Sequence, residues 1–82
     1  METKSIQKSY DEILIVRKSL FHEHLLKQIH GNDAHRYNIP EIGETIFIVD
    51  DFDGEMWKLK VKSLKTWDNG NSLEILCKGY RI

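Results

Sequence analysis

Four histidines are the first residues of this 82-residue chain whose type and spacing could support chemistry. His22, His24, His30 and His35 fall within fourteen residues, and imidazole is the commonest metal ligand in proteins. On a helix, however, His22 and His24 project about 200° apart. The i, i+4 histidine pair with an intervening glutamate, which binds zinc in metalloproteases, is absent. The histidines are therefore predicted to be solvated, and neither a metal nor a cofactor is expected.

The remaining candidate catalytic groups favour structural roles. Cys77 is the single cysteine, and its apolar position in a predicted strand is typical of inert packing. Asp50, Asp51 and Asp53 suggest a cation-binding loop, but Glu55 comes too early to be the twelfth ligand of a calcium loop. A hairpin turn explains these aspartates better, because their side chains bond to nearby backbone. No catalytic signature appears, so the sequence predicts a protein that is not an enzyme.

The distribution of charge is more informative than any motif. The net charge is −1, yet residues 41–57 hold six acidic and no basic side chains, and residues 58–82 hold six basic against two acidic. Lys58, Lys60 and Lys62 alternate with apolar residues, which places them on the solvent face of a strand. Lys65 and Trp67 follow near its end. The sequence thus predicts a polarised sheet with a row of exposed lysines.

Three interpretations of the lysine row remain open. Lysines on exposed strands commonly prevent edge-to-edge pairing with other chains. A basic strand near an aromatic side chain such as Trp67 could instead bind nucleic-acid backbone while bases stack, although the near-neutral net charge argues against strong nonspecific affinity. In the third interpretation the lysines contact the acidic surface of a protein partner.

The elements that must position these groups begin with a predicted amphipathic helix over residues 9–30. Ser9 and Glu12 have capping-box spacing, and Gly31 is a plausible stop. Apolar residues from Tyr10 to Ile29 fall on one half of the helical wheel, with Phe21 at the centre. Residues 13–16 are also rich enough in branched side chains to form a strand. The helix is preferred because residues 20–29 lack a period of two.

The predicted helix carries a second candidate surface. Ile15 and Leu26 lie outside its main apolar stripe, on one flank that also includes Lys18. The apolar arc is then wider than one sheet face can cover. The flank is predicted either to be wrapped by the rest of the chain or to contact a partner or a second copy.

The second half of the chain predicts a β-meander over residues 44–82, after a polar connector at 31–43. Strands are expected at 44–50, 56–66 and 73–80, with a two-residue turn at Asn69 and Gly70. That turn places Lys65 opposite Glu74 and Leu64 opposite Ile75. The apolar residues expected to face inward have odd numbers before residue 62, whereas Leu64 has an even number. A bulge is therefore expected near Lys62–Ser63.

Together these features predict one α+β domain over residues 1–82: a long N-terminal helix packed on a strongly bent three- or four-stranded antiparallel meander. With no catalytic group, the favoured function is a small protein-binding module that acts as a regulator or inhibitor. Ten isoleucines and nine lysines against three arginines hint at an AT-rich phage or mobile element, and hence at a host nuclease or other antiviral-defence component as target. The alternative is a small β-barrel that binds single-stranded nucleic acid or RNA.

The proposed binding residues are the lysines and Trp67 of the sheet and the helix flank: Lys58, Lys60, Lys62, Lys65, Trp67, Ile15, Lys18 and Leu26. A protein partner is expected, nucleic acid and a second copy of the chain remain open, and no membrane partner is expected. No apolar run approaches eighteen residues and no secretory signal is evident, so a cytoplasmic location is predicted.

Overall fold

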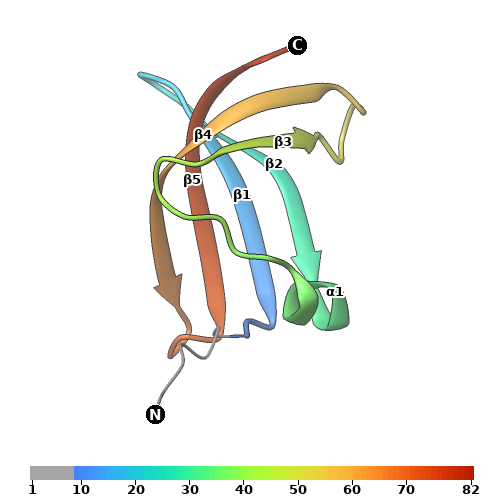
Figure 1. The fold of residues 1–82 in the computed structure, drawn as a ribbon, viewed down its shortest axis with the longest axis vertical. Helices are drawn as coiled ribbons and strands as arrows, with labels where there is room; N and C mark the ends of the chain where they lie inside the picture. Colours follow the sequence, from blue (N-terminus) through green and yellow to red (C-terminus); the bar gives the residue numbers. More distant parts are fainter. Residues whose placement is uncertain (1–8) are drawn as a thin grey trace.

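The computed structural model describes residues 9–82, which fold mostly as β-structure. The strands are β1 (Glu12–Lys18), β2 (Glu23–His30), β3 (Thr45–Val49), β4 (Met56–Trp67) and β5 (Ser72–Arg81), and the short helix α1 (Gly31–Arg36) follows β2. They form one sheet in the order β2-β1-β5-β4-β3. Figure 1 shows this sheet curled into a half-barrel with β2 and β3 at its two edges.

The predicted helix over residues 9–30, and with it the α+β fold class, is wrong. This segment forms the antiparallel β1–β2 hairpin. Ile13 and Ile15 are fully buried while Leu14 between them is only partly buried, which is the period of a strand. β1 also pairs with β5 in parallel, so a central strand with two neighbours replaces the isolated helix. Phe21, expected at the centre of a buried stripe, lies in the exposed β1–β2 turn.

The predicted meander is confirmed as β3, β4 and β5, and the predicted register is confirmed with it. Lys65 pairs with Glu74 and Leu64 with Ile75. The register shifts between Val61 and Ser63, so the predicted bulge also lies where the change of parity requires it. Before the bulge Trp57, Leu59 and Val61 are buried, whereas Leu64 beyond it is exposed although it pairs with the buried Ile75. The core contacts of β4 thus come from the part of the strand before the bulge.

The turn between β4 and β5 differs from the prediction. Four residues, 68–71, rather than two connect the strands, because Trp67 pairs with Ser72. Asp68, Asn69 and Gly70 all have positive φ, at 56°, 55° and 86°, and Gly70 N donates to Trp67 O at 3.1 Å. Aspartate and asparagine tolerate this left-handed conformation better than other non-glycine residues. The strand register is nevertheless as predicted, because a two-residue turn at 69–70 and a four-residue turn at 68–71 have the same centre.

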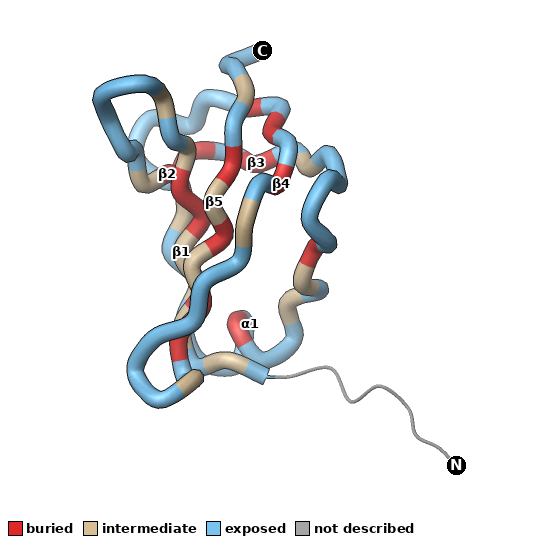
Figure 2. Tube along the Cα trace, turned by 90° about the vertical axis from the view of Figure 1, so that its left-hand side faces the viewer, coloured by how far each residue is buried: buried red, intermediate tan, exposed pale blue. Residues whose placement is uncertain are grey.

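The core lies on the inner face of the curled sheet. Its fully buried members come from four of the strands: Ile13, Ile15, Leu26, Leu59, Val61, Ile75 and Cys77. Ala34 of α1 joins them, so the predicted connector at 31–43 contributes to the core. In Figure 2 the buried residues alternate with exposed ones along the strands, and most loop residues are exposed. One face of the sheet is therefore left for solvent or a partner.

The two edges of the half-barrel are joined by the turn after β3. Asp51 N donates to Leu26 O of β2 at 2.8 Å, and the Asp51 carboxylate accepts from Lys27 Nζ at 2.8 Å and from Gln28 N at 3.1 Å. Asp50 Oδ1 accepts from Phe52 N at 2.7 Å. The prediction that these aspartates bond to nearby backbone is confirmed for Asp50 and for Asp53, whose Oδ1 accepts from Glu55 N at 2.9 Å. The Asp51 carboxylate instead binds the turn to β2.

Candidate nucleic-acid interface

Three side chains form an exposed row across the outer face of the sheet, opposite the core. The register places Phe47 of β3 beside Lys58 of β4, and Lys58 beside Tyr80 of β5. Phe47 is 59% exposed and Tyr80 is 60% exposed. Neighbouring strands lie about 4.8 Å apart, so the two aromatic positions are about 10 Å apart with a lysine between them. Phe47, Lys58 and Tyr80 are called the aromatic row below.

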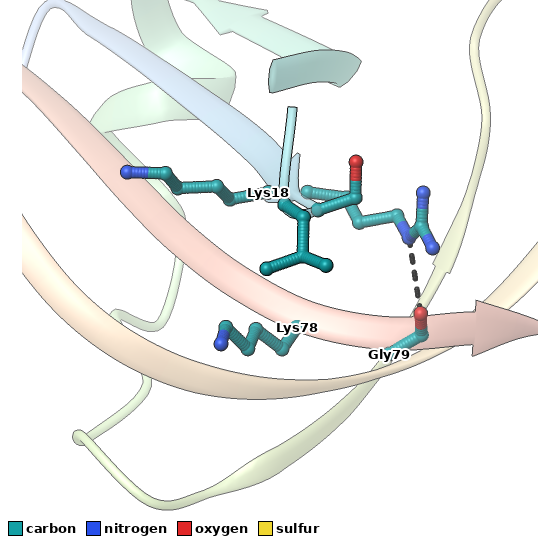
Figure 3. Close-up of a pocket in the computed structure, with 6 residues that line it drawn as sticks. Lys18, Lys78 and Gly79 are labelled. Carbon is teal, nitrogen blue, oxygen red and sulfur yellow. Dashed lines mark hydrogen bonds between the residues drawn. The ribbon is translucent and has the colours of Figure 1, made fainter. Parts of the chain in front are cut away.

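A second row, the lysine row, lies two residues further along the strands. Lys60 pairs with Lys78, and the parallel pairing of Arg17 with Cys77, carried one residue further, brings Lys18 beside Lys78. Figure 3 shows the Lys18 and Lys78 side chains extending in the same direction from adjacent strands. Lys18, Lys78 and Lys60 thus cross three strands, about 6.6 Å from the aromatic row.

The lysines of this face carry uncompensated charge. Within residues 9–82, the ion pairs of lysine and arginine involve Lys27, Arg36 and Arg81, and none involves Lys18, Lys58, Lys60, Lys62 or Lys78. Lys62, at the bulge, is exposed beside the two rows. Like charges on adjacent strands repel one another, which costs stability unless an anion lies over them. The outer face is therefore suited electrostatically to a polyanion.

An aliphatic row borders the aromatic row on its other side. Val49 pairs with Met56, and Ile82 N donates to Met56 O at 2.9 Å. All three side chains are exposed. The outer face therefore has three bands: aliphatic, aromatic with a central lysine, and basic.

The sheet residues predicted to bind a partner fall into two groups. Lys58, Lys60 and Lys62 lie exposed on the outer face of β4, as predicted. Trp67 lies five residues beyond Lys62, about 16 Å along the strand, and does not join the aromatic row. Lys65 is exposed but faces Glu74 across the strands, so its charge is partly offset.

The three residues of the predicted helix flank, Ile15, Lys18 and Leu26, do not form one surface in the hairpin. Ile15 and Leu26 are both fully buried in the core, because both strands turn these positions inward. They therefore lie on no surface that a partner could reach in this structure. Lys18 alone of the three reaches the outer face, where it joins the lysine row.

Sequence reasoning overlooked Phe47 and Lys78 as site residues and left Tyr80 without a role. One signal for Phe47 was available: β3 is apolar at both odd and even positions, although an antiparallel edge strand with one solvent face normally alternates. Lys78 pairs with Lys60 through the β4–β5 hairpin, whereas the place of Lys18 beside Lys78 depends on β1 lying parallel to β5, a long-range contact with no local sequence signal.

The groups first considered for catalysis take structural positions. Cys77 is buried, and burial raises the pKa of its thiol to about 11, so it stays protonated and unreactive near neutral pH. Burial also raises the pKa of the Tyr37 hydroxyl. His35 Nε2 lies 2.8 Å from Asp11 Oδ1, and His24 Nε2 lies 4.0 Å from Asp50 Oδ2. Among residues 9–82, no group of three or more histidine, cysteine, aspartate or glutamate side chains is placed to hold a metal ion.

Comparisons with protein-family models, curated proteins and solved structures gave no significant match. In the described part of the chain, no helix is long and apolar enough to cross a membrane.

Proposed function

We propose that this protein binds single-stranded nucleic acid on the outer face of β5, β4 and β3. The observation that carries the proposal is the aromatic row beside the lysine row. Proteins that bind single strands combine aromatic platforms for bases with a basic surface that follows the phosphates. In this proposal Phe47 and Tyr80 each stack one base, and Lys60, Lys78 and Lys18 contact the backbone.

The spacing of the two rows supports this arrangement. Phe47 and Tyr80 present two ring faces about 10 Å apart, too far for direct stacking on each other and open to one base each. Lys58 lies between them and would contact a phosphate or a base edge. Base stacking on an aromatic side chain contributes about 1–3 kcal/mol per base and tolerates any base. The expected specificity is therefore for single strands rather than for a sequence.

The lysines give the binding a characteristic dependence on salt. Contacts from three or four lysines to a single strand release condensed counterions, with a slope of log K against log salt of about −0.7 per contact. The expected slope is about −2 to −3. Affinity should therefore be moderate at physiological salt and rise steeply as the ionic strength falls.

Fluorescence anisotropy with labelled single-stranded DNA and RNA tests the proposal. The double variant Phe47→Ala, Tyr80→Ala should lose about 2–6 kcal/mol of binding free energy, while Phe52→Ala is the matched control, because Phe52 is 70% exposed but lies in the β3–β4 turn. Lys60→Glu with Lys78→Glu should lower both affinity and salt slope. Absence of saturable binding at low salt, or equal loss in the Phe52 control, would refute the proposal.

An acidic protein partner is the second candidate, and the aliphatic row is the observation that favours it. Val49, Met56 and Ile82 offer aliphatic area beside lysines, which suits a partner with an apolar centre and an acidic rim. Capture of partners from host lysate, before and after nuclease treatment, separates the candidates. A protein whose capture survives nuclease and is abolished by Met56→Asp would favour the second candidate. If nuclease treatment abolishes the capture, the result favours nucleic acid as the ligand.

A further inference from the structure

The turn between β1 and β2 presents two large apolar side chains to solvent. Leu20 is 90% exposed and Phe21 is 87% exposed, the two highest values among the large apolar residues described. Residues at tight turns are usually glycine, asparagine or aspartate, which satisfy the backbone or tolerate positive φ. Neither Leu20 nor Phe21 serves such a role, since both have negative φ. Turn formation does not explain their presence.

The position of this turn connects it to the aromatic row. The parallel pairing of β1 with β5 ends at Arg17 and Cys77, shortly before the turn. A pocket lined by Leu20, Lys18, Lys78 and Gly79 places Leu20 near the two residues of β5 that precede Tyr80. In Figure 1 the β1–β2 turn lies at the same end of the molecule as the end of β5. The turn thus lies near the end of β5 that carries Tyr80, the β5 member of the aromatic row.

The turn is also held in place. Ser19 N donates to His22 O at 2.9 Å, which closes the hairpin. At its base, Arg17 Nε donates to Gly79 O at 3.0 Å, drawn as the dashed line in Figure 3, and the Arg17 guanidinium lies 4.9 Å from the centre of the Trp57 ring. These contacts join the hairpin to β5 and β4. The turn that carries Leu20 and Phe21 is therefore held at a defined place near the end of β5.

We infer that Leu20 and Phe21 form a third base contact, so that the protein takes a single-stranded segment of three successive nucleotides running across the strands from β3 to β1. The inference rests on the proposed nucleic-acid function. The first base stacks on Phe47, the second on Tyr80 and the third against Phe21 and Leu20. The phosphates follow the parallel path of the lysine row, from Lys60 through Lys78 to Lys18. The occupant is a polyanion, because Lys18 and Lys78 of the lysine row line the same pocket as Leu20.

A length series measures this third contact. Affinities of the full chain for thymidine oligonucleotides of two to six residues should rise steeply up to three nucleotides and then level off. In Leu20→Ser with Phe21→Ser the steep rise should stop at two nucleotides, and the trimer should bind about five- to a hundred-fold more weakly than to the native chain. The dimer should bind both proteins equally. Phe21→Trp should restore the trimer affinity, because another aromatic ring supplies the same stacking surface.

The outcomes separate this inference from the proposed function. Unchanged trimer affinity in the turn variant, with loss of binding in the Phe47 and Tyr80 double variant, would overturn the third contact while leaving the nucleic-acid function in place. No binding of any oligonucleotide by the native chain would overturn both. Loss of dimer and trimer affinity to the same extent would show that the turn does not act on the third base. Both turn residues are exposed, so thermal melts should confirm that the variants remain folded.

Discussion

Ile15→Ala and Phe21→Ala each truncate an apolar side chain. We expect the first to lower the free energy of unfolding strongly and the second to leave it nearly unchanged. Ile15 is fully buried and Phe21 is almost fully exposed. Truncating Ile15 removes three carbon atoms at about 0.8 kcal/mol each and leaves a cavity, for a total loss of about 3–4 kcal/mol. A chain of this length has a free energy of unfolding of about 4–12 kcal/mol, so the variant should be at the edge of stability. Phe21→Ala should change stability by less than about 0.5 kcal/mol.

Urea denaturation followed by the fluorescence of the buried Trp57 measures both effects. With a slope of about 1 kcal/mol per molar urea, Ile15→Ala should lower the midpoint by about 3 M, while Phe21→Ala should leave it nearly unchanged. On an amphipathic helix over residues 9–30 the order would reverse, because Phe21 would lie at the centre of the buried stripe and Ile15 on its flank. A larger loss for Phe21→Ala than for Ile15→Ala would therefore refute the hairpin and with it the placement of the turn near the end of β5.

Three further outcomes are expected. Cys77, whose pKa burial raises to about 11, should not react with an aromatic disulfide reagent at pH 8 until urea unfolds the chain, and rapid reaction in the native state would contradict its place in the core. The hydrogen bond from Lys27 and that from the Gln28 amide lower the pKa of Asp51, so its contribution to stability is complete above the ordinary value of 3.8 and is lost as pH falls through the lowered pKa. Asp51→Asn should flatten stability against pH in that acidic range, and an unchanged profile would exclude this contact as a stabilising one. A Cβ at position 79 would overlap the Lys58 carbonyl oxygen, so Gly79→Ala should cost about 1–3 kcal/mol or more in a thermal melt, and a native-like melting temperature would contradict the close approach of β4 and β5.

The second half of the fold was predictable because its signals are local. The turn at residues 68–71 fixes the pairing of Lys65 with Glu74 whether two or four residues form it, because the centre of the turn is the same. The change of parity between Val61 and Leu64 requires a bulge, and the bulge lies there. The exposure of Lys58, Lys60 and Lys62 follows from the same alternation. From β3 to β5, where paired strands follow one another in the chain, pattern, register and burial agree.

The first half was mispredicted because its outcome depends on a distant partner. Ile13 could face inward on either a helix or a strand, and the branched side chains of β1 were a genuine signal for the strand. One of the two pairings of β1 joins it to β5, about sixty residues away, and the local sequence pattern gives no indication of it. A β1–β2 turn with apolar rather than glycine or asparagine residues also concealed the hairpin. Apolar residues at that turn are a departure from turn chemistry, and such departures often mark functional positions.

The net charge of −1 gave no indication of the basic face, because acidic side chains elsewhere in the chain balance the lysines in the sum. Asp51 binds the turn after β3 to Lys27 and Gln28 of β2, and Asp50 is buried with one oxygen in that turn. Glu55 lies 3.9 Å from Arg81 at the aliphatic end of the sheet. These carboxylates take part in contacts within the half-barrel, whereas no ion pair in residues 9–82 compensates Lys18, Lys60 or Lys78. For a curled sheet the location of each charge, rather than the net charge, decides whether one face is basic.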